Sequence, residues 1–177
     1  MSRHVALLRG INVGGRNRLS MAALVDVFES LGYPVVDTLI QSGNVVFRAP
    51  PGEGDAAAGR VSREILGRHG FEPAVLVLAA PAFAAVVADN PFPADAGKAL
   101  HVFFVSEPPS AADLPRLNRL ASPTEQFVLG PKAFYLLAPD GIGRSRLAPA
   151  VESALGVPVT ARNGNTVMAL AGLLADG

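Results

Sequence analysis

The order of apolar patterns along the chain is the feature that most constrains its fold. Runs rich in β-branched residues, which are typical of strands, alternate with segments whose apolar residues recur every three or four positions, which are typical of helices. In the first half the predicted elements are strand 5–8, helix 20–31, strands 35–40 and 44–48, helix 58–70 and a buried strand 74–78. In the second half they are strand 100–105, helix 110–120, strands 126–129 and 133–137, helix 146–155 and strand 157–161.

Both halves therefore follow the order strand, helix, strand, strand, helix, strand, which is that of the ferredoxin-like βαββαβ unit. We predict an α+β fold of two tandem ferredoxin-like subdomains, with an additional connecting helix around Phe83 and a C-terminal helix carrying Val167, Leu170 and Leu174. The expected boundaries are 1–79 for the first subdomain, 80–98 for the connecting helix and loop, and 99–177 for the second subdomain.

Local signals place several helix ends. Ser20 is expected to cap the first helix, and Gly32 to close it in a left-handed conformation. Ser110 with Asp113 has the spacing of a capping box, which predicts the start of the helix that follows. Gly156 is expected to end the helix predicted from about Arg146.

Composition limits the classes of function. The 177 residues are half apolar and carry 15 basic and 15 acidic side chains, so the chain has a core to bury and no net field for nucleic acid or anionic membrane. Cysteine is absent, and the three histidines stand alone, so we expect no metal site and no cofactor. No apolar run is long enough for a membrane span, which makes a cytoplasmic protein the default expectation.

The segment from Leu7 to Arg18 runs from an apolar strand into a loop dense in glycine, amide and guanidinium groups. Glycines after a strand let backbone N–H groups point into one concavity, where arginines would complement a phosphate or carboxylate. The alternative is a tight turn that needs glycine for positive φ. The spacing matches neither the dinucleotide fingerprint nor the Walker A loop. The candidate ligand-binding residues here are Arg9, Gly10, Asn12, Gly14, Gly15 and Arg16.

A second group of candidates lies in the hairpin turn of the same half. Gln41 and Ser42 stand between the two predicted strands, and Asn44 is the first residue of the second. In a βαββαβ unit the end of the first strand and the start of the third meet at one edge of the sheet, so this turn is expected beside Gly10 to Gly14. Alternatively, these side chains only bond their own backbone.

Two loops in the second half carry similar residues. Arg144 and Ser145 precede a predicted helix, so an anion could meet its N-terminus; alternatively, Ser145 is only the helix cap. Arg162, Asn163 and Asn165 stand before the last helix in the same way, and either asparagine could be its cap.

These segments together resemble the bacterial family called domain of unknown function 1697. The resemblance rests on 7–18, 40–47, 90–93, 140–145 and 162–166, in order along the chain. It implies an α+β protein of two ferredoxin-like subdomains and supplies no reaction. Family members usually have tryptophan between the two asparagines, where this chain has Gly164, so a contact made by that aromatic ring is lost or replaced here.

Three functions are consistent with these observations. The first is a module that binds an anionic small molecule or a nucleic-acid backbone at the glycine, asparagine and arginine loops. The second is an enzyme acting on an anionic substrate at the same loops, although Asp140 is the only carboxylate within these segments and no catalytic residue is identified. The third is a purely structural or oligomerisation role. The sequence does not indicate an oligomeric state.

Overall fold

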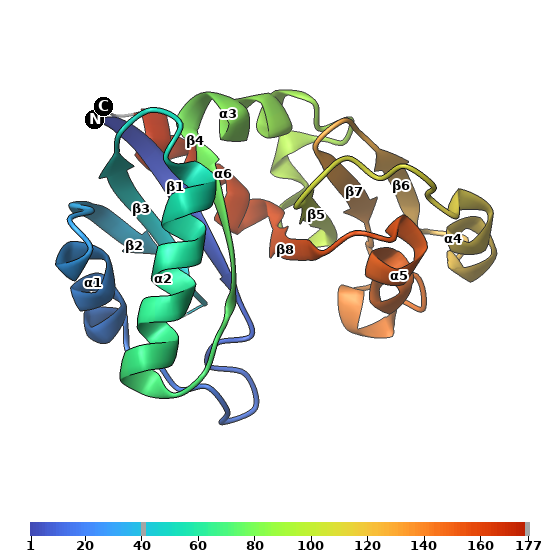
Figure 1. Ribbon diagram of the computed structural model, residues 1–177. Helices are drawn as coiled ribbons and strands as arrows, with labels where there is room; N and C mark the ends of the chain where they lie inside the picture. The colour runs from blue at the N-terminus through green and yellow to red at the C-terminus, as the bar shows by residue number, and fades with distance from the viewer. Residues whose placement is uncertain (40–41, 176–177) are drawn as a thin grey trace. The chain divides into compact units, whose positions relative to one another are not determined.

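The structure, a computed structural model, describes residues 1–39 and 42–175 (Figure 1). It confirms the mixed α+β class and contains two four-stranded antiparallel sheets. By its internal contacts the chain divides into two compact units, 1–85 with 169–177 and 86–168. The chain passes from one unit to the other within α3 (Ala80–Ala88) and returns within α6 (Gly164–Ala175).

The first unit contains the first sheet in the order β2-β3-β1-β4, with every neighbouring pair antiparallel. Its elements are β1 (Ser2–Arg9), α1 (Met21–Ser30), β2 (Val35–Leu39), β3 (Asn44–Ala49), α2 (Gly54–His69) and β4 (Ala74–Ala79). The predicted ends of α1 are confirmed: the Ser20 side chain accepts from the Ala23 N–H at 3.1 Å, and Gly32 has φ 81°.

The core of this unit lies between one face of the sheet and the two helices. Alternate residues of β1 and β3, such as Ala6 and Phe47, are fully buried against apolar residues of α1 and α2. The Phe47 ring is central, because its centroid lies 4.9 Å from that of Phe28 and 5.5 Å from that of Tyr33. Burial of aromatic rings at these separations stabilises the contact between helices and sheet.

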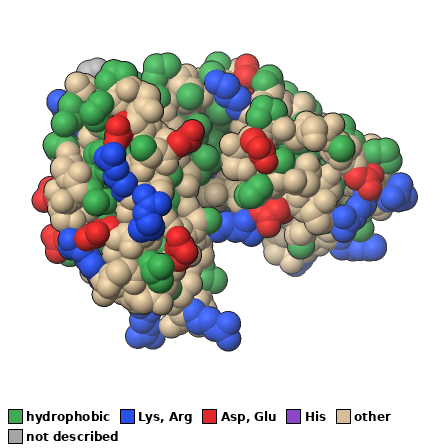
Figure 2. Space-filling view, in the orientation of Figure 1, with side chains coloured by type: hydrophobic (Ala, Val, Ile, Leu, Met, Phe, Trp, Pro, Cys, Tyr) green, Lys and Arg blue, Asp and Glu red, His purple; other side chains and the backbone are tan. Residues whose placement is uncertain are grey.

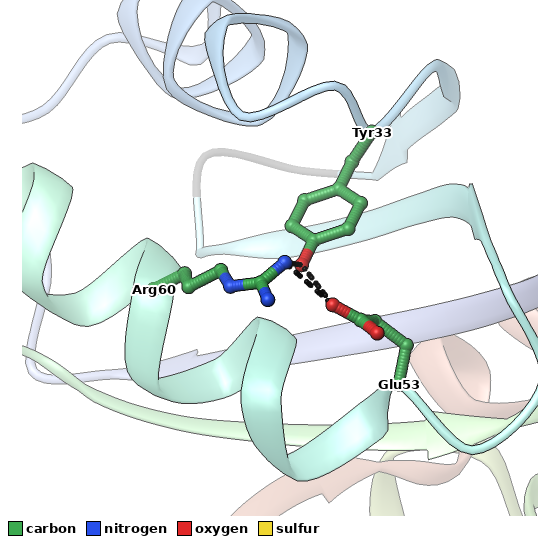
Figure 3. A network of polar contacts seen from close by, with 3 residues as sticks. All are labelled: Tyr33, Glu53 and Arg60. Atoms are coloured by element: carbon green, nitrogen blue, oxygen red, sulfur yellow. Dashed lines mark hydrogen bonds and ion pairs between the residues drawn. The ribbon is translucent and has the colours of Figure 1, made fainter.

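A polar network stands at the edge of this core (Figure 3). The Tyr33 hydroxyl donates to Glu53 Oε1 at 3.0 Å and accepts from Arg60 Nη1 at 3.0 Å, while Arg60 Nη1 pairs with Glu53 Oε1 at 2.6 Å. Burial raises the pKa of Tyr33, and the bond to Glu53 adds to this, against the opposing effect of Arg60. The tyrosine therefore stays neutral and ties the chain after α1 to the first turns of α2.

The second unit contains the second sheet, in the order β6-β7-β5-β8, again with antiparallel neighbours. Its strands and helices are η1 (Ala94–Ala99), β5 (Leu100–Val105), α4 (Leu114–Leu120), β6 (Gln126–Leu129), β7 (Ala133–Leu137), η2 (Ile142–Arg144), η3 (Ala148–Ala150), α5 (Val151–Leu155) and β8 (Val159–Asn163). Its core packs α4 and α5 against β5 and β7, with Phe103 and Phe134 in edge-to-face contact.

The helix predicted over 146–155 is wrong in its first half. Within this range the chain forms a 3₁₀ turn, η3, and the α-helix begins only at Val151; another 3₁₀ turn, η2, precedes the predicted range. Pro149 explains the break, since proline has no N–H and is tolerated only in the first turn of a helix. Ser145 does not cap an α-helix: its Oγ accepts from the N–H of Ala148, the first residue of η3, at 2.9 Å, and the N-cap of η3 is Leu147.

Three smaller predictions also need correction. The helix α4 is capped by Asp113, whose side chain accepts from the Arg116 N–H at 3.0 Å, and not by Ser110; Pro115 fixes the first turn there. The strand predicted at 74–78 is present but mostly half-exposed, because β4 is an edge strand. The strand predicted at 157–161 begins two residues later, after Pro158.

Among the described residues, no helix has the length and apolarity needed to cross a membrane.

Candidate functional site

The loop between β1 and α1 contains a tight two-residue turn. Gly14 and Gly15 have φ of 58° and 74°, and the Arg16 N–H donates to the Val13 carbonyl at 3.0 Å. Positive φ at both central residues is the signature of a type I′ turn, which only glycine or a short polar residue adopts without strain. Glycine is therefore needed in this loop for its backbone conformation, which agrees with the alternative of a tight turn.

Two asparagines hold the stem of this turn. Asn12 Nδ2 donates to the Leu19 carbonyl, and the Leu19 N–H donates to Asn12 Oδ1, both at 2.8 Å. The Asn12 N–H also donates to the Asn17 carbonyl at 3.0 Å, and Asn17 Nδ2 donates to the Gly10 carbonyl at 2.9 Å. Both asparagines have positive φ, 53° and 50°. The Asn12 amide is thus a structural element of the loop.

A pocket of about 390 Å³ opens beside this turn. The residues that line it come from the loop and from the start of α1: Asn12, Gly15, Arg18, Leu19, Ser20 and Met21. The Arg18 guanidinium lies along the turn, because a Cβ built on Gly15 would be 3.8 Å from Arg18 Nη2. The pocket therefore places a cation opposite the first turn of a helix.

The electrostatics of this pocket favour an anion. The first N–H groups of a helix have no partner within the helix, and its dipole makes that end positive. No acidic residue stands in the first turn of α1. Among the described residues, neither Arg16 nor Arg18 makes an ion pair, and both are exposed. Figure 2 shows Lys and Arg side chains at the end of the first unit where Figure 1 draws this loop.

The turn after β2 meets the base of this loop, as predicted. The Leu8 N–H donates to the Gly43 carbonyl at 2.8 Å, and a Cβ on Gly43 would lie 2.9 Å from Ile11 Cδ1. Asn44 is fully buried, and its Nδ2 donates to the Leu39 carbonyl and to Ser42 Oγ. Asn44 and Ser42 therefore shape their own turn. Gln41 lies outside the described residues.

The remaining first-unit candidates lie on the surface around this loop. Arg9 is exposed at the end of β1, where it pairs in register with Ala74, and Gly10 follows it with φ 80°. Arg16 is exposed on the turn itself. None of these three residues lines the 390 Å³ pocket.

The candidates of the second half lie in the second unit. Asn163 caps α6, because its Oδ1 accepts from the Thr166 N–H at 3.0 Å. Arg162 is partly buried on β8, and this burial lowers its pKa to about 10, so it stays charged at neutral pH. Arg144 is exposed in η2, beside Ser145. The last residues of β7 and β8 pair with the first residues of β5, one on each side. The segments that follow β7 and β8 therefore leave the sheet at the same end.

Gly164 and Gly97 touch at the start of α6. A Cβ on Gly164 would lie 2.7 Å from the Gly97 carbonyl oxygen, and a Cβ on Gly97 would lie 3.0 Å from Asn165 Oδ1. Gly97 has φ 56° and ψ −115°, which is non-helical backbone inside η1. The backbone of η1 thus occupies the place that a side chain at 164 would take.

Of the residues that line the 390 Å³ pocket, only Asn12 and Gly15 were among the candidates predicted from the sequence. Arg18 was noted only as the end of the loop segment and Ser20 only as a helix cap, and neither Leu19 nor Met21 was a candidate, yet all four line the pocket. The signal was available, because an N-cap immediately after an arginine-containing loop marks a helix N-terminus beside cations.

Among the described residues, no three histidine, aspartate or glutamate side chains gather as metal ligands.

Comparison with known proteins gives a family and a fold. The family model described as "Protein of unknown function (DUF1697)" matches residues 1–135. The structure of conserved bacterial protein SP0830 from Streptococcus pneumoniae aligns with a TM-score of 0.68 over 98% of both chains, at 22% sequence identity. At that identity the likeness is one of fold alone. The search of curated proteins gave no match.

Proposed function

We propose that this chain, which belongs to the DUF1697 family of proteins of unknown function, binds an anionic small molecule at the pocket between Arg18 and the start of α1. The ligand group is a phosphate or carboxylate. It accepts hydrogen bonds from the first N–H groups of α1 and a charge-assisted pair from the Arg18 guanidinium.

One observation carries this proposal: a guanidinium, a helix N-terminus and a left-handed glycine turn line a single pocket without a carboxylate among them. Each contributes a donor or a positive field, and their effects on one anion add. The pocket volume of about 390 Å³ suits a small molecule.

Binding, rather than catalysis, fits the chemistry of the lining. General acid–base catalysis uses a side chain that exchanges a proton near neutral pH, such as histidine or a perturbed carboxylate. The lining consists of Asn12, Gly15, Arg18, Leu19, Ser20 and Met21, which offers donors and apolar surface but no such group.

A pair of matched variants tests the proposal. Arg18 and Arg16 are both exposed on the same loop, but only Arg18 lines the pocket. Titration with pyrophosphate, followed by thermal shift and calorimetry, is expected to show binding that Arg18→Gln weakens at least about tenfold, or about 1.4 kcal/mol. Arg16→Gln removes the same charge and is expected to change affinity far less. Equal losses in the two variants would indicate a diffuse charge effect and no site.

We also propose that each of the two units is a ferredoxin-like subdomain. Support comes from the element order β1-α1-β2-β3-α2-β4, with its equivalent in the second unit, and from the central position of the first and third strands in each antiparallel sheet. In that arrangement the loop after the first strand and the turn before the third share one end of the sheet.

A further inference from the structure

A second pocket lies in the second unit, at the end of the sheet where β6 begins and β7 ends. Its volume is about 190 Å³, roughly six times the ~30 Å³ that one water takes up in the liquid. Its polar lining is Ser122, Glu125, Asp140, Gly141, Arg144 and Ser145. Unlike the pocket of the first unit, it contains side chains of both charge signs.

The two carboxylates of this pocket are each held by one oxygen. Glu125 Oε2 accepts from the Ser122 N–H at 2.8 Å, and Asp140 Oδ2 accepts from the Thr124 hydroxyl at 2.5 Å. Within the described part of the chain, the second oxygen of each carboxylate makes no further hydrogen bond. The carboxylates are thus oriented and retain acceptors for a ligand.

Arg144 shares the pocket with these carboxylates without pairing with them. Over residues 1–39 and 42–175, no nitrogen of Arg144 comes within 4.0 Å of an acidic oxygen. Ser145 Oγ accepts from the Ala148 N–H, so its own O–H is available to donate. The pocket therefore keeps a cationic donor and two anionic acceptors apart, although all of them line one small space.

We infer that this pocket binds a zwitterionic small molecule of the α-amino acid class. The ligand carboxylate is held by the Arg144 guanidinium and the Ser145 hydroxyl, and the ligand ammonium donates to the second oxygens of Asp140 and Glu125. A ligand with only a negative charge would be repelled by the two carboxylates, and a ligand with only a positive charge would be repelled by the guanidinium. Only a ligand that carries both charges a few bonds apart is attracted by all of these groups.

The test uses the full-length protein and the standard L-α-amino acids as probes, with binding followed by calorimetry and by amide chemical shifts. For the amino acid that binds most tightly, the methyl ester and the N-acetyl derivative remove one ligand charge each. Both derivatives are expected to bind at least about tenfold more weakly. If no amino acid binds, or if either derivative binds as well as the parent, the inference is overturned.

Two variants locate the site. Arg144→Gln and Asp140→Asn are each expected to weaken binding at least about tenfold, whereas Arg146→Gln, at an exposed position two residues further on, is expected to leave affinity unchanged. Arg144 is exposed, so its variant carries the test even if Asp140→Asn disturbs the bond to Thr124. Arg18→Gln should have no effect on this binding, which separates the outcome from that of the first-unit pocket. Unchanged affinity in Arg144→Gln would contradict the assignment.

Discussion

Asn12 and Leu19 exchange two hydrogen bonds of 2.8 Å, in which the asparagine side chain pairs with a backbone seven residues away as a neighbouring strand would. This pair closes the loop that carries the glycine turn and Arg18. It sets where the loop ends and therefore where α1 begins. The geometry of the proposed anion pocket depends on it.

Asn12→Ala is expected to lower the free energy of unfolding by about 1–3 kcal/mol, because the Leu19 backbone groups lose their partners and alanine is strained at φ 53°. Asn12→Gly removes the same hydrogen bonds without that strain, so its loss should be smaller. Urea unfolding monitored by circular dichroism measures both. If Asn12→Ala is as stable as the wild type, the loop is not held in this way.

Gly43→Ala tests the contact between the turn after β2 and the base of the loop. The added Cβ would lie 2.8 Å from Leu8 Cβ and 2.9 Å from Ile11 Cδ1, at a φ of 78°. Strain and overpacking together are expected to cost about 2–4 kcal/mol. Gly52→Ala is the matched control, since it has φ 82° and open space around it, and it should cost only about 1–2 kcal/mol. Equal losses would refute the close packing at Gly43.

The first unit shows what the sequence could and could not predict. The apolar spacing within 20–31 and the signals at Ser20 and Gly32 predicted α1 correctly, because local capping chemistry agrees there with the burial of Leu24, Val27 and Phe28. The pairing of Asn12 with Leu19 could not be predicted, since a side chain that replaces a backbone partner leaves no periodic signal. In the second unit, the break before Val151 was missed because the effect of Pro149 on the predicted helix was not considered.

A pair of glycines in α6 provides a third prediction. Gly164→Ala would place a Cβ 2.7 Å from the Gly97 carbonyl oxygen, and it is expected to destabilise by about 1–3 kcal/mol. Gly172→Ala, in the same helix with nothing within 4 Å, should instead stabilise by about 0.5–1 kcal/mol. Thermal unfolding of the two variants measures the difference, and shifts of the same sign would contradict the contact between Gly164 and Gly97.

His101 predicts a dependence of stability on pH. Its side chain is 8% exposed on β5, its Nε2 has no hydrogen-bond partner among the described residues, and burial lowers its pKa from the usual 6.5. Below pH 6.5 the unfolded chain therefore binds a proton at His101 more readily than the folded chain does. The free energy that His101 contributes to stability is complete above pH 6.5 and is lost as pH falls below that value. His101→Leu should flatten this slope in urea unfolding measured across that range. An unchanged slope would assign the acid sensitivity to other groups.

The central claim is that the first turn of α1, Arg18 and the Gly14–Gly15 turn together bind one anion. The most direct measurement is a titration of isotope-labelled protein with inorganic phosphate, followed through the backbone amide signals of Gly14, Gly15, Met21 and Ala22. We expect these signals to shift together along one saturating curve, and the curve to flatten in Arg18→Gln but not in Arg16→Gln. Shifts that are scattered over the surface, that fail to saturate or that persist in Arg18→Gln would contradict the claim.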